Sequence, residues 1–205
     1  MRLHLMRLAL IIAACAPASL ALGAPSSAHE HHDAVAAIEP TGASLYNLDQ
    51  TWTAQDGARV PLRALAGKPV VAAMGYTTCK DICPAIVVDM MWIEKHLAPA
   101  EAERVRFAFF SLDPAADTPE RLELYAEAHG LASARWTLLR ADDDAVRELA
   151  QALGVGYRPN GQAGFDHSAA ISLIDEKGEI VFQQRGTRAS SDELLDKLKA
   201  LLAGE

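Results

Sequence analysis

Two cysteines, Cys79 and Cys83, lie four residues apart in the segment spanning residues 75–84. The apolar run at residues 70–75 is typical of a buried strand, and apolar residues recur at helical spacing through residues 83–97. Side chains four apart on a helix have Cβ atoms about 5–6 Å apart, so both sulfurs are expected on one side of the helix entry. This spacing suits two thiolates that bind one soft metal ion, or a disulfide. The amides and dipole of the helix N-terminus are expected to lower the pKa of both thiols.

A histidine far downstream is a candidate third ligand. His167 immediately precedes an apolar stretch, residues 169–174, which is expected to form another strand. A lone histidine at the start of a strand is more often structural than a ligand. In an α/β chain that also carries two closely spaced thiols, it becomes a candidate to complete a metal site.

Three motifs together resemble those of a known family. They are Gly-Tyr-Thr-Thr-Cys-Lys-Asp-Ile-Cys-Pro at residues 75–84, Ser-Leu-Asp-Pro-Ala-Ala-Asp-Thr-Pro at residues 111–119, and Asp-His-Ser at residues 166–168. In this order they resemble the SCO (SenC/PrrC) family of copper-binding cytochrome c oxidase assembly proteins. The resemblance covers roughly residues 45–202. It implies a thioredoxin-like fold.

The resemblance also implies a ligand set, in which copper is held by Cys79, Cys83 and His167. Two thiolates satisfy soft Cu(I), and an added imidazole gives a trigonal set that also holds Cu(II). A closed zinc site would need a fourth ligand, which no further cysteine or histidine motif supplies. The chain departs from the family pattern at Lys80, where the family usually has proline. A cation beside Cys79 favours the thiolate, which also suits redox chemistry.

The function implied by the resemblance is delivery of copper, as Cu(I) or Cu(II), to a respiratory cytochrome c oxidase. The copper-bearing subunit of the oxidase is then the expected partner, with another periplasmic copper carrier as a second one. The alternative is a thiol–disulfide oxidoreductase that reduces cysteines of an exported partner, in which Cys79 attacks and Cys83 resolves. The CxxxC spacing and the histidine favour metal over this alternative. A peroxidase of the peroxiredoxin type is disfavoured, because Ala72 and Tyr76 stand where that chemistry expects proline and threonine.

Four further residues are expected near the site. Tyr76 should line its wall, and Asp117 should belong to a loop or helix cap beside it. Asp81 and Asp166 could each orient a ligand, although exposed carboxylates are the commoner outcome at such positions.

The elements that must position these residues predict an α/β fold: a three-layer thioredoxin-like sandwich with an N-terminal β-hairpin extension. In such sheets, functional groups gather at strand ends, where loops meet helix N-termini. The expected elements are a hairpin of residues 45–52 and 58–60, strands at 70–75, 105–112, 136–140, 169–174 and 179–184, and helices at 83–97, 119–129, 142–153 and 190–202.

The N-terminal residues predict export. Residues 1–28 have the basic start and apolar stretch of a signal segment, and the alternative is a lipoprotein signal ending at residue 14, before Cys15. Residues 29–42 predict a disordered, histidine-rich leader, and residues 43–205 the copper-binding domain. The domain is therefore expected in the periplasm or anchored to the membrane facing it, where a disulfide could form between the paired cysteines.

Charge argues against one class of partner. The net charge of −8 becomes −10 after loss of the two arginines in residues 1–28, and no cluster of lysine and arginine is present. An acidic domain of this kind is repelled by phosphates, so a nucleic-acid partner is not expected.

Overall fold

The computed structural model describes residues 40–161, 164–187 and 191–204. The expected export signal and residues 29–39 of the expected leader lie outside these described residues. Within them, no helix has both the length and the apolar character needed to cross a membrane.

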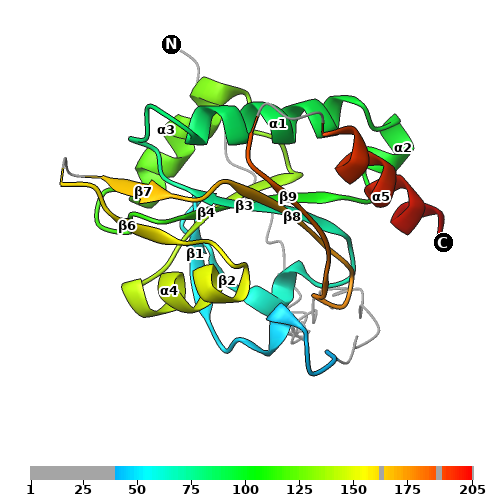
Figure 1. Cartoon of the computed structure of the whole chain (residues 1–205), viewed down its shortest axis with the longest axis horizontal. Helices are drawn as coiled ribbons and strands as arrows, with labels where there is room; N and C mark the ends of the chain where they lie inside the picture. The colour runs from blue at the N-terminus through cyan, green and yellow to red at the C-terminus, as the bar shows by residue number, and fades with distance from the viewer. Residues whose placement is uncertain (1–39, 162–163, 188–190, 205) are drawn as a thin grey trace, which may run out of the picture. The chain divides into compact units, whose positions relative to one another are not determined.

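A seven-stranded sheet is the scaffold (Figure 1). Its strands in chain order are β1 (Thr51–Ala54), β2 (Arg59–Pro61), β3 (Val70–Gly75), β4 (Arg106–Ser111), β5 (Trp136–Arg140), β8 (Ala170–Ile174) and β9 (Ile180–Arg185). They are arranged β2-β1-β5-β4-β3-β8-β9. The central β3, β4 and β5 are parallel, and β8 and β1 join this set antiparallel. Every residue of β3 is buried, which explains its uninterrupted apolar sequence.

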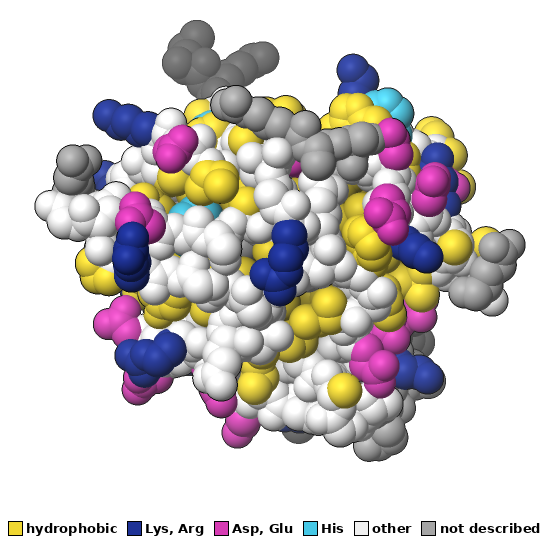
Figure 2. Space-filling view, viewed as in Figure 1, with side chains coloured by type: hydrophobic (Ala, Val, Ile, Leu, Met, Phe, Trp, Pro, Cys, Tyr) yellow, Lys and Arg dark blue, Asp and Glu magenta, His cyan; other side chains and the backbone are white. Residues whose placement is uncertain are grey.

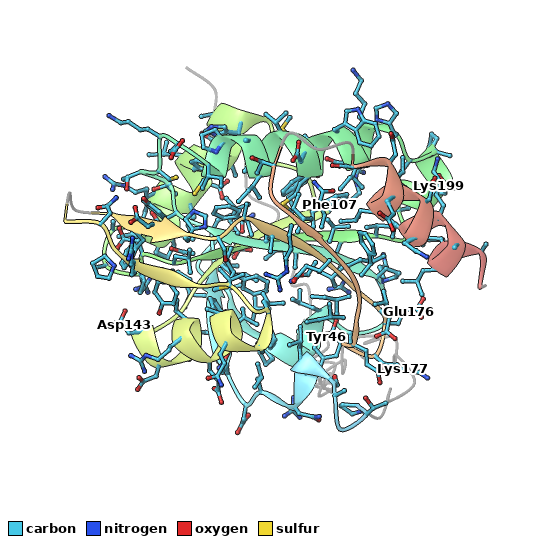
Figure 3. The ribbon with its side chains drawn as sticks, viewed as in Figure 1. Tyr46, Phe107, Asp143, Glu176, Lys177 and Lys199 are labelled. Atoms are coloured by element: carbon cyan, nitrogen blue, oxygen red, sulfur yellow. The ribbon has the colours of Figure 1, made fainter. Side chains whose placement is uncertain are left out.

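Helices cover both faces of the sheet. The helices are α1 (Cys83–Lys95), α2 (Pro99–Ala102), α3 (Pro119–His129), α4 (Asp143–Ala152) and α5 (Asp192–Ala203). Figure 1 shows α1, α3 and α5 above the sheet and α4 below it. The two cores this creates contain Phe107 on the side of α1 and Tyr46 on the side of α4, and both side chains lie in the interior in Figure 3. The three-layer α/β arrangement predicted from the sequence is therefore confirmed.

The N-terminal hairpin is present but shorter than expected. β1 pairs with β2, and β1 also pairs with β5 at the edge of the parallel strands. The prediction of a strand from residue 45 was wrong, because residues Leu45–Asn47 form a 3₁₀ helix. The hydroxyl of Ser44 accepts a hydrogen bond from the Tyr46 amide (3.1 Å), and such local capping competes with strand pairing.

A second, two-stranded sheet was not predicted. It consists of β6 (Tyr157–Pro159) and β7 (Phe165–His167), which pair antiparallel with each other. We call residues 156–161 and 164–168 the arm. The Asn160-Gly161 pair between its two strands is a turn signal that could have indicated it.

Surface charge is mixed in sign on the face that Figure 2 shows. Lysine and arginine side chains there are interspersed with aspartate and glutamate.

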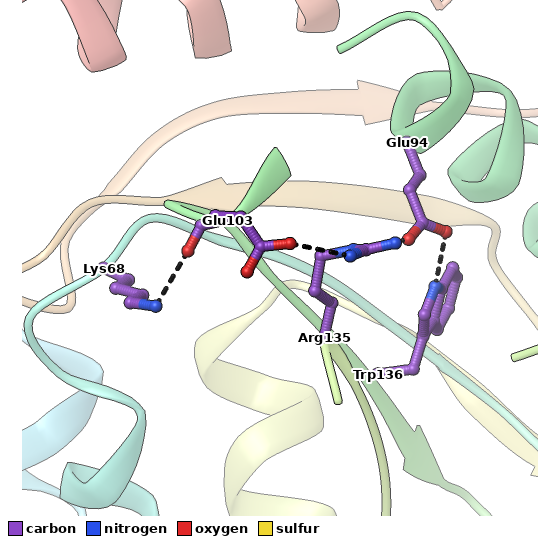
Figure 4. Close-up of polar contacts among 5 residues, drawn as sticks. All are labelled: Lys68, Glu94, Glu103, Arg135 and Trp136. Atoms are coloured by element: carbon purple, nitrogen blue, oxygen red, sulfur yellow. Dashed lines mark hydrogen bonds and ion pairs between the residues drawn. The ribbon is translucent and has the colours of Figure 1, made fainter. Parts of the chain in front are cut away.

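One polar cluster joins α1 to the start of β5 (Figure 4). The Glu94 carboxylate accepts hydrogen bonds from Arg135 Nε (2.8 Å) and from the Trp136 indole N–H (2.7 Å). Arg135 also pairs with Glu103 (3.2 Å), whose side chain is 74% exposed, against 19% for Glu94.

Glu94→Ala is expected to lower the free energy of unfolding by about 2 kcal/mol, because it leaves the buried Trp136 indole N–H without its acceptor. Glu103→Ala is the matched control, and removal of this exposed ion pair should cost at most about 0.5 kcal/mol. Urea denaturation of both variants checks the difference. Equal losses would show that the indole contact carries no special weight.

Candidate metal centre

The topology brings three distant segments to one edge of the sheet. β3 and β4 are parallel and end together, with Gly75 opposite Ser111. β8 is antiparallel to β3, so its start lies beside the end of β3, with Ala73 opposite Ile171. The loop that follows β3, the loop that follows β4 and the arm that precedes β8 therefore meet at this edge.

The two cysteines surround the start of α1. Cys83 is the first residue of the helix and is fully buried, whereas Cys79 is half-buried in the loop before it. The Cys79 sulfur accepts a hydrogen bond from the Cys83 amide (Sγ to N, 3.4 Å), at a helix start that lacks a side-chain cap on Ile82. The thiol thus satisfies a helix-terminal amide that an N-cap side chain would normally bind.

Gly75 leaves room for the buried sulfur. A Cβ added at this position would lie 3.0 Å from Cys83 Sγ and 2.8 Å from Phe109 Cζ. Real Cβ atoms do not approach neighbours this closely, so only glycine fits beneath the first turn of α1.

His167 reaches the cysteines from the arm. It is the last residue of β7, and its Nε2 lies 3.1 Å from Cys83 Sγ. Nδ1 lies 3.2 Å from the Ser168 carbonyl oxygen, which accepts a hydrogen bond from the Nδ1–H tautomer. In this tautomer Nε2 keeps its lone pair on the side of the Cys83 sulfur, which is the arrangement of a metal-binding histidine.

The structure thus brings together the three residues singled out in the sequence. Their donor atoms, Cys79 Sγ, Cys83 Sγ and a ring nitrogen of His167, all lie within 4.8 Å of one another. Bonds of about 2.0–2.3 Å to nitrogen and sulfur, as zinc sites show, place donors about 3.5–4 Å apart, so small side-chain rotations would close this set on one ion. Two sulfurs and one imidazole are a soft donor set, which fits copper. Their role as ligands stays a prediction.

A cleft of about 620 Å³ opens onto this group. Cys79 and His167 line it, together with Tyr76, Thr78, Lys80, Asp81, Ile82, Asn160, Gly164, Phe165 and Asp166. Cys83 lies beneath this lining. Another molecule would therefore meet Cys79 and His167 first.

The two thiols differ in acidity. Burial raises the pKa of Cys79, but hydrogen bonds from the Cys83 thiol and from the amides at the helix start outweigh it and lower that pKa overall. Burial, and then the hydrogen bond to Cys79, raise the pKa of Cys83. The expectation that both thiols would be acidified was therefore wrong for Cys83, because its burial outweighs the helix terminus. Burial also lowers the pKa of His167, which favours the neutral imidazole.

The neighbouring carboxylates differ in burial and in their partners. Asp81 is exposed, and Asp166 pairs with Arg158 on the exposed side of the arm (3.3 Å). Asp117 is fully buried and accepts hydrogen bonds from the Thr77 amide, the Thr77 hydroxyl and the Ser111 hydroxyl. It thereby fixes the loop two residues before Cys79. The sequence located Asp117 near the site, but did not reveal its burial.

A three-layer α/β domain with two cysteines at the start of α1, and a histidine beside them, is the architecture of a thioredoxin-like protein with a potential metal centre. Solved structures of Sco proteins have the same fold as this domain. The sequence profile of the SCO1/SenC family matches residues 39–203, and the chain belongs to that family.

Individual relatives are distant. The SCO1 protein homolog of Bacillus subtilis (strain 168) is 27% identical over 154 residues, which cover 73% of this chain and 79% of the relative. The copper-bound structure of ScoI from Bradyrhizobium japonicum is 26% identical, with a TM-score of 0.63 over 74% of this chain and 96% of the other. BsSco, described as a member of the Sco family of cytochrome c oxidase assembly proteins with a disulfide switch, has a TM-score of 0.66 at 24% identity, over 82% of this chain and 94% of its own.

Proposed function

We propose that this protein is a copper chaperone that binds copper through Cys79, Cys83 and His167 and delivers it to the copper centre of a respiratory cytochrome c oxidase. The observation that carries the proposal is the convergence of two sulfurs and one imidazole within 4.8 Å, with Cys79 and His167 lining a cleft. Membership of the SCO1/SenC family and the copper bound by Bradyrhizobium ScoI support the choice of metal.

Delivery requires that copper pass from these donors to those of the acceptor. The buried sulfur of Cys83 holds the ion from below, while Cys79 and His167 face the cleft. An incoming cysteine or histidine of the partner would enter beside these two and replace them in turn. The process is ligand exchange and involves no turnover of a substrate.

The proposed partner is the copper-bearing subunit of the oxidase, with another periplasmic copper carrier as a second partner. The family of BsSco is described by its role in oxidase assembly, and this supports the choice of partner.

A thiol–disulfide oxidoreductase is the second candidate. One observation favours it: the pKa of Cys79 is lowered and that of Cys83 is raised, as in a pair with one attacking and one resolving sulfur. The position of His167 beside Cys83 favours copper, because disulfide exchange does not need an imidazole there.

For its location, we propose that residues 1–28 direct export, or that a lipoprotein signal ends at residue 14. Residues 29–42 would then be a leader, and residues 43–205 the copper-binding domain on the periplasmic side. The basic start and apolar stretch of residues 1–28 support this proposal.

His167→Ala separates the two candidate functions. It should weaken Cu(II) binding more than about hundredfold, since loss of a ligand exceeds the effect of losing an outer hydrogen bond. Cu(I) should be weakened less, because two thiolates remain. Oxidase activity in cells lacking the native gene should be lost, while the purified dithiol still cycles with glutathione. His129→Ala is the control, because His129 bonds its own helix (Nδ1 to the Tyr125 carbonyl oxygen, 2.9 Å) and does not line the cleft. Full oxidase activity with His167→Ala, and loss only with the cysteine variants, would favour the oxidoreductase.

A further inference from the structure

The arm that carries His167 is not part of the seven-stranded sheet. In the described part of the chain, β6 and β7 pair with each other in a separate two-stranded sheet. A two-stranded ribbon is only marginally stable by itself. The position of His167 therefore depends on what holds the arm against the rest of the domain.

Tyr76 provides such a contact from the end of β3. Its hydroxyl donates a hydrogen bond to the Phe165 carbonyl oxygen (2.9 Å) and accepts one from the Phe165 amide (3.1 Å). Its ring also meets the rings of Phe165 and His167 edge-on, with centroids 5.8 and 6.0 Å apart. One side chain, 5% exposed, thus binds both backbone groups of a residue 89 positions away.

The backbone of the arm is shaped to admit this hydroxyl. A Cβ added at Gly164 would lie 2.9 Å from the Tyr76 hydroxyl oxygen and 3.4 Å from its ring. Glycine at this position therefore allows the hydroxyl to reach the Phe165 backbone.

These contacts act on His167, the proposed ligand. Phe165 and His167 are two residues apart on β7, so their side chains point to the same face of the strand. Because both backbone groups of Phe165 are held, the position and orientation of β7 are fixed, and β7 carries the imidazole. Cys79 and Cys83 belong to the opposite wall, at the start of α1. Cys83 Sγ meets the arm at His167 Nε2 (3.1 Å), and the Tyr76 side chain also interacts with Cys79.

From these contacts we propose that Tyr76 is a positioning residue, whose hydroxyl holds the arm so that His167 Nε2 stands beside the Cys83 sulfur. The hydroxyl thereby sets the affinity of the site for Cu(II) relative to its affinity for Cu(I). This inference rests on the proposed function. Since the imidazole matters most to Cu(II) and the thiolates to Cu(I), loss of the hydroxyl changes the two affinities unequally.

Tyr76→Phe tests this inference because it removes only the hydroxyl. The affinity for Cu(II) should fall about tenfold to hundredfold, as for other groups that orient a metal ligand. Cu(I) affinity should change less than about threefold, since both cysteine ligands are retained. The reduction potential of bound copper should rise by about 59 mV for each tenfold selective loss of Cu(II). The nitrogen coupling in the Cu(II) spectrum of electron paramagnetic resonance should weaken.

A readout without metal accompanies these measurements. In the copper-free domain, amide hydrogen exchange at Phe165 should be faster in Tyr76→Phe than in the wild type, while exchange in β3 should be unchanged. Gly164→Ala should reproduce the selective loss of Cu(II) with Tyr76 intact, because it displaces the hydroxyl. Tyr125→Phe is the matched control: this tyrosine is also buried, and its hydroxyl has no hydrogen-bond partner among the described residues.

The outcomes distinguish this inference from the proposed function. If His167→Ala retains wild-type Cu(II) affinity, the proposed ligand set is wrong. If His167→Ala loses Cu(II) but Tyr76→Phe behaves like the wild type, the ligand set stands and the positioning role is overturned. Equal losses of Cu(I) and Cu(II) in Tyr76→Phe, with a lower melting temperature, would also overturn it, because they would mark a general effect on stability.

Discussion

Cys83→Ala should abolish stoichiometric copper binding, with Cu(I) affinity reduced more than about hundredfold, beyond the loss caused by removing an outer hydrogen bond to a ligand. The sulfur of Cys83 lies at the buried base of the donor group, 3.1 Å from His167 Nε2. Because the cleft exposes Cys79 and His167 but not this position, water cannot readily replace the lost donor. Anaerobic titration with a Cu(I) chelator competitor, followed by elemental analysis of the purified domain, measures the effect.

Two variants serve as controls for Cys83→Ala. Cys83→Ser keeps the size of the side chain but replaces a soft donor with a hard one, and should also lose Cu(I). Met90→Leu removes another fully buried sulfur of α1 with little change of volume, and should retain copper. Stoichiometric copper in Cys83→Ala would refute the proposed site.

Copper affinity should rise steeply with pH between about pH 6 and pH 8, because the thiols must lose their protons to bind. The raised pKa of Cys83 keeps its thiol protonated in the copper-free domain, so binding releases that proton. The second proton comes from the Cys79 thiol, whose pKa is lowered. Binding releases it only while the pH is below that pKa. Each released proton contributes about a tenfold rise in affinity per pH unit, so we expect about tenfold to hundredfold per unit, with the smaller slope at higher pH.

His167 should not add to this slope near neutral pH. Its pKa is lowered, chiefly by burial. At a pH above the ordinary pKa of histidine, the imidazole is therefore already neutral and has no proton to release. Cu(I) competition at a series of pH values gives the slope, and calorimetry in buffers of different ionisation enthalpy counts the protons. The His167→Ala variant should show the same slope in this window. An affinity independent of pH would contradict thiolate ligation.

The parts of the fold with strong local signals were predicted well from the sequence. The bounds of β3 and β5 are those expected. β3 is an uninterrupted apolar run, and β5 ends just before the Asp142 cap of α4. Helix α3 begins after Thr118, whose hydroxyl accepts a hydrogen bond from the Arg121 amide, as the Thr-Pro pair predicted. The expected candidates Cys79, Cys83 and His167 also lie together.

The parts that were missed depend on contacts with distant residues. β6 and β7 are three residues long and largely polar at their exposed positions, so alternation gives little signal. The link between Tyr76 and Phe165 spans 89 positions, and no local pattern reports it. The opposite pKa shifts of the two cysteines follow from the burial of Cys83 and from the hydrogen bonds that Cys79 accepts at the helix start. Both are properties of the packed domain.

Gly75 places a limit on how the sequence of this domain can diverge. Five residues of the cleft wall are exposed: Thr78, Lys80, Asp81, Asn160 and Asp166. Substitutions at these positions change the surface that an acceptor meets while the fold is retained. At Gly75 even a methyl group would collide with the Cys83 sulfur and with Phe109, whose ring is itself stacked on Tyr125 (centroids 5.9 Å apart). A larger residue would displace the Phe109 ring, the Cys83 sulfur or both. Partner recognition can therefore drift during evolution, while the depth of the buried donor remains constrained by a residue that has no side chain.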